Sequence, residues 1–321
     1  MLPQYLAQAN LLTKVIPLCF ESAPLALKGG TAINLFVTDL PRLSVDLDCV
    51  YVDRYASRIQ ALEEIDRTLH DLHDCFTSNG LKSMTNRSFS ERLTKLVVSD
   101  GSASVKIEIN PVHRGVLLVP EMLPFCPKAQ SLFSISENIE IPVLARDELY
   151  AGKLVAALDR QHPRDLFDVA VLMHEGGITD VMLDCFTVVL ACSSRPCHEV
   201  LAGNDRDLSG PFESSFVGLT DYIVNAEDLN QVRTDLRYDI LTGLGRTRFE
   251  FLYSLLTLEP RWDLMPFDDL DRLPAIKWKL TNLDRLRDIN PDKFASQHNA
   301  LADLYDQAQQ LSRGRLRPHS R

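Results

Sequence analysis

The hydrophobic pattern changes once along the chain, near residues 141–145, and this change limits the folds available to it. Before it, short segments with strand character surround one long amphipathic stretch, residues 55–78, with apolar residues every three or four positions. From Arg146 onward, apolar residues recur at helical spacing almost to the end. We therefore expect an α+β fold, with a sheet and helices in residues 1–143, an all-helical domain in 144–311 and a basic tail in 312–321.

The first part contains the predicted strands and the turns between them. We expect strands over residues 24–28, 43–52, 81–88, 92–99 and 104–112, with a hairpin turn at Ser99-Asp100-Gly101-Ser102. Helices are predicted over residues 3–22, 32–37 and 55–78, and residues 141–144 are expected to form a connector. In the second part, helices are predicted over residues 146–160, 164–174, 180–192, 226–240, 246–257, 272–288 and 293–311.

Composition and charge exclude several classes of protein. The chain has 321 residues, 45% of them apolar, without the unbroken apolar run of a membrane span or a secretory signal. An odd number of cysteines, seven, is not typical of a disulfide framework and favours the cytoplasm. The net charge of −10 argues against a surface devoted to nucleic acid, while leaving room for a local basic patch.

Two aspartates, Asp46 and Asp48, are the first candidate site residues. Side chains alternate between the faces of a strand, so these two point the same way while Leu47 and Cys49 point into apolar packing. Neighbouring carboxylates repel each other, and two oxygen ligands one pleat apart suit a hard divalent ion such as Mg²⁺. The alternative is an exposed polar face without a metal.

A glycine turn, Gly29-Gly30-Thr31, lies between a predicted strand and helix shortly before this pair. Glycines permit close approach to the backbone, and the free N–H groups of a helix start attract phosphate oxygens. The turn would equally serve as a plain helix start capped by Thr31. Turn and acidic pair together favour a phosphate and metal site more than either does alone.

A third carboxylate, Glu108, shares one face of its strand with Lys106 and Asn110. If this strand neighbours that of Asp46, Glu108 completes an acidic triad. A solvated outer face is the equally weighted alternative.

A second segment, residues 148–168, places Lys153 among apolar and small residues, with Asp165 in the first turn of the following helix. A lysine is a point charge suited to triphosphate oxygens, and Asp165 would orient that lysine or a substrate group. The alternative is a surface lysine beside an Arg164–Asp168 helix pair.

Three of these segments, in this order, resemble the AbiEii-type nucleotidyltransferases, the toxins of type IV toxin–antitoxin and phage-defence pairs. The resemblance covers most of residues 1–175 and, more loosely, the helical remainder. It is carried by Leu27-Lys28-Gly29-Gly30-Thr31, by Arg42-Leu43-Ser44-Val45-Asp46-Leu47-Asp48, and by Lys153-Leu154-Val155-Ala156-Ala157-Leu158 with Arg164-Asp165-Leu166-Phe167-Asp168.

The resemblance implies a DNA polymerase β-like nucleotidyltransferase core with a site built from these segments. The Gly29-Gly30-Thr31 turn would hold the phosphates of a nucleoside triphosphate (NTP), and Asp46 and Asp48 would bind the metal. Lys153 and Asp165 match the catalytic lysine and aspartate of the family, with Asp168 as a rival for Asp165. Ser44 matches a family serine whose phosphorylation would add charge beside Asp46.

The resemblance also implies substrates and partners. Family members suggest the 3′ end of tRNA as the acceptor, and other RNA or protein acceptors stay open, as does the choice of NTP. A cognate antitoxin is expected to be encoded nearby, with direct binding left open. The acidic chain would then meet RNA through local basic residues, for which the candidates are Lys82, Arg87, Arg92, Lys95, Arg285, Arg287, Arg313, Arg315 and Arg317.

Two alternative functions remain at this point. A nucleotide-binding or antitoxin-docking module without turnover would keep the glycine turn, yet it has no need of the intact Asp46/Asp48 pair. A metal-dependent phosphohydrolase usually has histidine ligands, and the histidines of this chain lack ligand spacing.

Overall fold

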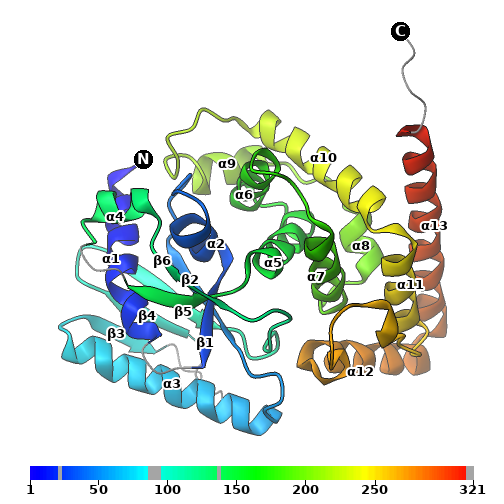
Figure 1. Cartoon of the computed structure of the whole chain (residues 1–321), viewed down its shortest axis with the longest axis horizontal. Coiled ribbons are helices and arrows are strands. Elements are labelled where there is room, and N and C mark those ends of the chain that lie inside the picture. Colours follow the sequence, from blue (N-terminus) through cyan, green and yellow to red (C-terminus); the bar gives the residue numbers. More distant parts are fainter. Residues whose placement is uncertain (21–23, 86–94, 136–138, 316–321) are drawn as a thin grey trace. The chain divides into compact units, whose positions relative to one another are not determined.

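The computed structural model describes residues 1–20, 24–85, 95–135 and 139–315, and it divides into two compact units (Figure 1). The first, here the sheet unit, comprises Met1–Leu149 and Glu213–Ile223. The second, the helical unit, comprises Tyr150–Phe212 and Val224–Arg321. The division falls inside the helices α5 (Arg146–Asp159) and α9 (Ser209–Ser215). The domain boundary that the sequence predicts between residues 143 and 144 stays a prediction.

A mixed sheet of seven strands, in the order β3-β4-β5-β2-β1-β7-β6, forms the centre of the sheet unit. Strands β2 and β5 pair in parallel, as do β1 and β7, and the other neighbours are antiparallel. The strands are β1 (Leu25–Lys28), β2 (Asp46–Tyr51), β3 (Lys82–Thr85), β4 (Lys95–Ser99), β5 (Ser104–Ile109), β6 (Glu121–Pro124) and β7 (Glu140–Val143). The predicted α+β class, with a mixed sheet followed by helices, is confirmed.

Helices α1 (Pro3–Cys19) and α3 (Arg58–Ser78) pack on one face of this sheet (Figure 1). Burial raises the pKa of the Cys19 thiol on α1, and Cys49 on β2 lies close enough to raise it further. Odd-numbered residues of β2 therefore face the helices, as period-two alternation requires. The opposite face, which carries Asp46 and Asp48, is called the open face below.

The sequence predictions for the sheet unit are correct for β1 to β5 within a few residues, apart from predicted ends in 21–22, 86–88 and 92–94 that fall outside the described residues. The predicted connector is wrong, because Glu140–Val143 is the strand β7, paired with both β1 and β6. Pro142 is the reason that this strand was not predicted, because proline has no N–H to donate to a neighbouring strand and is therefore unusual inside a sheet. Strand β6 and helix α4 (Pro127–Phe133) were also missed.

The helical unit buries a continuous apolar core from helices that the periodicity largely predicts. Its further helices are α6 (Pro163–His174), α7 (Asp180–Ala191), α8 (Cys197–Ala202), α10 (Ala226–Gly243), α11 (Gly245–Leu256), α12 (Pro274–Ile289) and α13 (Pro291–Arg315), with 3₁₀ turns η2 (Trp262–Leu264) and η3 (Leu270–Arg272). Helix α13 continues through Arg315, so the first part of the expected basic tail is helical. The rest of that tail lies outside the described residues.

Two further observations bear on the classes that the sequence excluded. All seven cysteines have free thiols. Within the described part of the chain, no helix combines the length and apolarity needed to cross a bilayer.

Candidate active site

The glycine turn begins helix α2 (Gly29–Ala32) directly after β1 and fixes the position of Asp48. Gly29 has φ +76°, a left-handed conformation that favours glycine. A Cβ at this position would lie only 2.9 Å from Asp48 Oδ2. The carboxylate of Asp48 thus lies against the turn, and a larger residue at position 29 would displace it.

Asp46 and Asp48 are half-buried on the open face, while Leu47 and Cys49 are fully buried on the other. The predicted alternation along β2 is therefore confirmed. The Thr31 hydroxyl is hydrogen-bonded to Ser44 Oγ (2.8 Å) and to the main-chain carbonyl of Asp46. These contacts join the glycine turn to the start of β2.

Arg42 lies at the second glycine of the turn and was not predicted as a site residue. It is 2% exposed, and a Cβ on Gly30 would come within 2.7 Å of its Nη2 atom and 3.3 Å of Ser44 Oγ. Its Nη1 atom donates to the carbonyl of Leu43 at 2.9 Å. Its position beside Gly30 depends on the assembled turn, which no local sequence pattern predicts.

The helix that starts at the turn continues as a π-helical segment, η1 (Ile33–Val37), where the periodicity predicted only a regular helix. The Asn34 side chain donates from Nδ2 to the Gly30 carbonyl at 2.8 Å and accepts from the Arg42 amide at 3.3 Å. Asn34 thereby connects the main chain of Gly30 to the main chain of Arg42. π-Helical turns are rare and recur at functional sites.

The electrostatics around Asp48 favour a cation. Burial raises the pKa of Asp48, the charges of Asp46 and Glu108 add to that rise, and Lys28 on β1 and Lys106 on β5 oppose it. Lys28 is the register partner of Asp48 on β1. A carboxylate that burial and two like charges disfavour gains stability when a cation arrives.

Glu108 lies on β5, which pairs with β2 in parallel and places Glu108 opposite Asp48. The predicted neighbourhood is therefore confirmed. However, Glu108 Oε1 forms an ion pair with Lys95 at 3.2 Å, and Oε2 forms one with Lys106 at 3.0 Å. Burial opposes ionisation of Glu108, yet the hydrogen bonds from both lysines lower its pKa. Glu108 as a metal ligand stays a prediction.

In the described ranges, no group of three or more His, Cys, Asp or Glu side chains is arranged to hold a metal ion. Asp46 and Asp48 as metal ligands therefore stay a prediction from the sequence. Oxygen ligands of this kind fit Mg²⁺, which is typically held by one or two carboxylates and completes its shell with water and phosphate oxygens.

Lys153, Asp165 and Asp168 form a buried cluster inside the helical unit. Lys153 Nζ lies 2.8 Å from Asp165 Oδ1 and 2.9 Å from Asp168 Oδ2. The side chains of Lys153 and Asp165 are 7% and 4% exposed, and that of Asp168 is fully buried. The alternative of a surface lysine is therefore wrong. Arg160, which is largely exposed, adds an ion pair to Asp165 at 2.9 Å.

Glu148, near the start of α5, makes a contact that the sequence did not predict. Its Oε2 atom accepts hydrogen bonds from the main-chain amides of Leu117 and Leu118, both at 2.9 Å. Burial raises the pKa of Glu148 to about 7, and the two amides, Arg54 and Lys28 oppose that rise. Glu148 fixes the 117–118 loop to α5.

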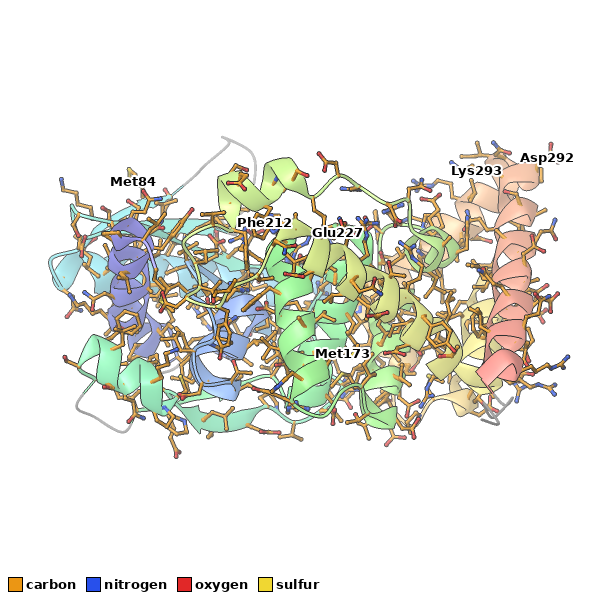
Figure 2. The ribbon with its side chains drawn as sticks, turned by 90° about the horizontal axis from the view of Figure 1, so that it is seen from above. Met84, Met173, Phe212, Glu227, Asp292 and Lys293 are labelled. Carbon is orange, nitrogen blue, oxygen red and sulfur yellow. The ribbon has the colours of Figure 1, made fainter. Side chains whose placement is uncertain are left out.

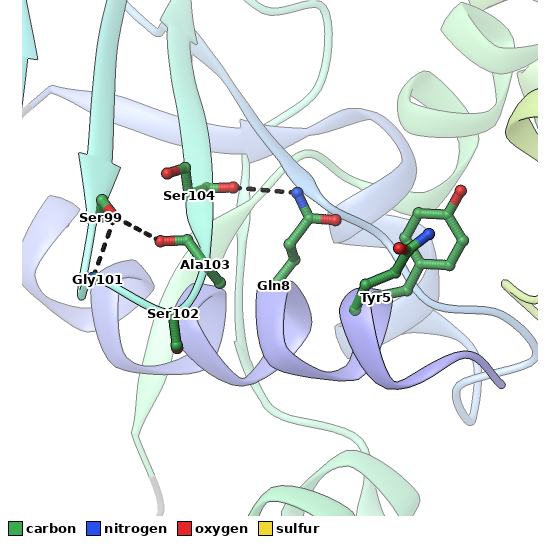
Figure 3. Close-up of a pocket in the computed structure, with 8 residues that line it drawn as sticks. Tyr5, Gln8, Ser99, Gly101, Ser102, Ala103 and Ser104 are labelled. Carbon is green, nitrogen blue, oxygen red and sulfur yellow. Dashed lines mark hydrogen bonds between the residues drawn. The ribbon is translucent and has the colours of Figure 1, made fainter.

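One cavity of the sheet unit, of about 410 Å³, contains none of these residues (Figure 3). It lies between α1 and the β4–β5 hairpin and is lined by Gln4, Tyr5, Gln8, Ser99, Gly101, Ser102, Ala103 and Ser104. Gln8 donates to the Ser104 carbonyl at 3.1 Å, and Ser99 Oγ donates to the Ala103 carbonyl at 2.7 Å. These bonds hold the predicted hairpin, whose strands pair in register from Ser99 with Ser104.

With this geometry in place, comparisons with known proteins become informative. Residues 10–282 match the family model described as "Nucleotidyl transferase AbiEii toxin, Type IV TA system". The chain belongs to this family. It is therefore a nucleotidyltransferase toxin of the type IV toxin–antitoxin class, which implies an NTP substrate and an antitoxin partner.

Among solved structures, the chain is similar to MenT4, a nucleotidyltransferase toxin from Mycobacterium tuberculosis H37Rv, with 19% sequence identity and a TM-score of 0.53. The match covers 94% of this chain and 93% of MenT4, and it supports the fold. No curated protein matches the chain in sequence.

Proposed function

We propose that this AbiEii-family toxin transfers a nucleotide from an NTP to the 3′ end of an RNA, with tRNA as the expected acceptor, and thereby stops translation and growth. The observation that carries the proposal is the contact between the glycine turn and the acidic pair, measured by the 2.9 Å between a Cβ at Gly29 and Asp48 Oδ2. This contact would put a phosphate-binding turn directly beside a cation-binding carboxylate.

In this proposal, Asp46 and Asp48 hold Mg²⁺, which would neutralise charge on the triphosphate and on the attacking and leaving oxygens. The main-chain amides of Gly29, Gly30 and Thr31 donate to phosphate oxygens at the start of α2. Arg42, packed against Gly30, keeps the turn in its conformation and adds positive charge beneath it. Ser44 fixes Thr31 through their hydrogen bond.

Lys153 and Asp165 are proposed to act as a pair. A protonated Lys153 would stabilise negative charge that develops on the phosphates, and Asp165 would hold the lysine charged and oriented. Asp168 is the second anion at Lys153 Nζ and would keep the ammonium group paired while Asp165 interacts with the acceptor hydroxyl. Asp165 is therefore the proposed catalytic carboxylate, and Asp168 a positioning residue.

An NTP and an RNA acceptor place the reaction in the cytoplasm. The antitoxin partner is expected to be encoded nearby, and its surface on this chain is not assigned.

The proposal is tested by incubating purified protein with Mg²⁺, each labelled NTP and total tRNA, beside Asp46→Ala and Asp71→Ala. Asp71 is an exposed carboxylate on α3, the helix on the covered face, and serves as the matched control. We expect label in RNA with the wild type and with Asp71→Ala but not with Asp46→Ala. Label that never enters RNA, or that enters equally with Asp46→Ala, would remove the proposal.

A further inference from the structure

Lysines from three strands gather on the open face of the sheet unit, beside the acidic pair. Cross-strand partners share a face, so the register determines which residues lie together. Lys82 pairs with Ser99, Met84 with Val97, Val97 with Lys106, and Lys95 with Glu108. The residues Lys82, Met84, Lys95, Val97 and Lys106 thus form one surface, which we call the lysine face.

The lysine face is accessible in the described structure. The side chains of Lys95 and Lys106 are 47% and 42% exposed, Lys82 is exposed, and Met84 is 63% exposed (Figure 2). The chain as a whole carries a net charge of −10. Three lysines, of which Lys95 and Lys106 pair with the single carboxylate of Glu108, therefore make a positive area on an otherwise acidic protein.

Glu108 connects this surface to the acidic pair. It holds Lys95 and Lys106 through one oxygen each and stands opposite Asp48 in the β2–β5 register. Its negative charge lets the two ammonium groups lie close to each other despite their repulsion. A row of charged residues thus runs from β4 across β5 to Asp48.

We infer that the lysine face binds the phosphodiester backbone of the acceptor RNA and leads its 3′ end toward Asp46 and Asp48. This inference rests on the proposed function. The lysines match phosphates spaced along a strand, and Met84 with Val97 offers an apolar surface to the sugars and bases. Glu108 acts here as the positioning residue for Lys95 and Lys106.

The test measures binding of a fluorescently labelled tRNA without NTP, by anisotropy at several salt concentrations. The variants are Lys82→Gln/Lys95→Gln, Met84→Ala and the control Lys14→Gln, an exposed lysine on α1 at the covered face. Circular dichroism and thermal melting verify that each variant is folded.

Removing two phosphate contacts should raise the Kd roughly tenfold or more and lower the slope of log K against log salt by about 1 to 2. Met84→Ala should raise the Kd about threefold and leave the slope unchanged, because an apolar contact releases no counterions. Lys14→Gln should leave both quantities at the wild-type values. A double variant that binds tRNA like the wild type overturns the inference.

The same samples separate this inference from the proposed function. Asp46→Ala should lose transfer while keeping the tRNA Kd within about twofold of the wild type. Transfer that survives Asp46→Ala contradicts the proposed function. Transfer lost in Asp46→Ala, together with unchanged tRNA binding in the double lysine variant, contradicts only the lysine face.

Discussion

The carboxylates of the acidic pair in the sheet unit and those of the buried cluster in the helical unit have different electrostatic surroundings. Asp165 and Asp168 share a lysine within 3 Å, shielded from solvent. Burial raises the pKa of Asp48; the charges of Asp46 and Glu108 add to the rise, and those of Lys28 and Lys106 oppose it. In the helical cluster one buried lysine contacts both carboxylates directly, whereas burial and two like charges leave the pKa of Asp48 raised, a cost that a bound cation would relieve.

This difference predicts how much each site contributes to stability, apart from the part each is proposed to play in the reaction. A buried ion pair is strongly destabilised when one partner is removed, because the other charge is left in a medium of low polarity. A carboxylate held next to like charges is already unfavourable, so its removal costs little stability. The same chemical change, Asp to Asn, should therefore cost much more stability in the helical cluster than in the acidic pair.

The largest effect on stability is expected for Asp168→Asn. It removes one of the two anions at Lys153 Nζ in a fully buried position. We expect the free energy of unfolding to fall by about 3 to 5 kcal/mol, measured by urea denaturation. The control Arg160→Gln removes a largely exposed partner of Asp165 and should cost less than about 1 kcal/mol. If both variants lost the same unfolding free energy, burial would not explain the stability of the Lys153 cluster.

Glu148 is a carboxyl group of the sheet unit that is buried but has main-chain amides as partners. Its pKa of about 7 in the folded protein lies above the ordinary value of 4.5. The unfolded chain therefore releases this proton first, and stability is lost as the pH rises from about 4.5 to about 7.

Relative to Glu148→Gln, the wild type should lose about 3 kcal/mol over this pH interval, as measured by denaturation at several pH values. The glutamine keeps a hydrogen-bond acceptor for Leu117 and Leu118 and does not titrate. A difference that grows in favour of the wild type with rising pH would show that the two amide donors outweigh burial.

A smaller effect is expected for Gly29→Ala, which tests the contact between the turn and Asp48. A left-handed alanine costs about 1 to 2 kcal/mol, and the new methyl group would also push Asp48 away. Gly80→Ala is the matched control, since Gly80 has φ +78° with no neighbouring atom within 4 Å of its Cβ position. Both variants should lose similar stability, and nucleotide transfer should fall only in Gly29→Ala. Normal transfer in Gly29→Ala would separate the turn from the site.

The smallest effect on stability is expected for Asp48→Asn. Without divalent ions, its free energy of unfolding should stay within about 1 kcal/mol of the wild type, because the lost charge was opposed by burial and by Asp46. Added Mg²⁺ should then raise the melting temperature of the wild type more than that of the variant, since an ion that binds only the folded state stabilises it. Identical Mg²⁺ responses would count against Asp48 as a ligand.

The sequence predicted those parts of the site that depend on local pattern. Alternation along β2 was enough to place Asp46 and Asp48 on one face, and the glycine turn was evident between a strand and a helix. Lys95 was a candidate for RNA binding from the sequence, but the ion pairs of Lys95 and Lys106 with Glu108 were not predictable, because they depend on the β4–β5–β2 register. Register is a property of the assembled sheet.

Other contacts were missed for the same physical reason. Glu148 meets amides 30 and 31 residues earlier in the chain, and the guanidinium of Arg42 is placed by the turn that it packs against. Strand β7 was hidden by Pro142, which local propensity assigns to a connector although the sheet accepts it. Arg87, Arg92 and Arg317, named as candidates for RNA binding, lie outside the described residues.

The central claim is that the acidic pair beside the glycine turn carries nucleotide transfer, and the rate of label transfer to RNA by Asp48→Asn tests it most directly. The rate should be compared with that of the wild type at saturating Mg²⁺, using protein shown to be folded. The account predicts a loss of at least about 100-fold with unfolding free energy almost unchanged. A folded Asp48→Asn protein that labels RNA at the wild-type rate would contradict it.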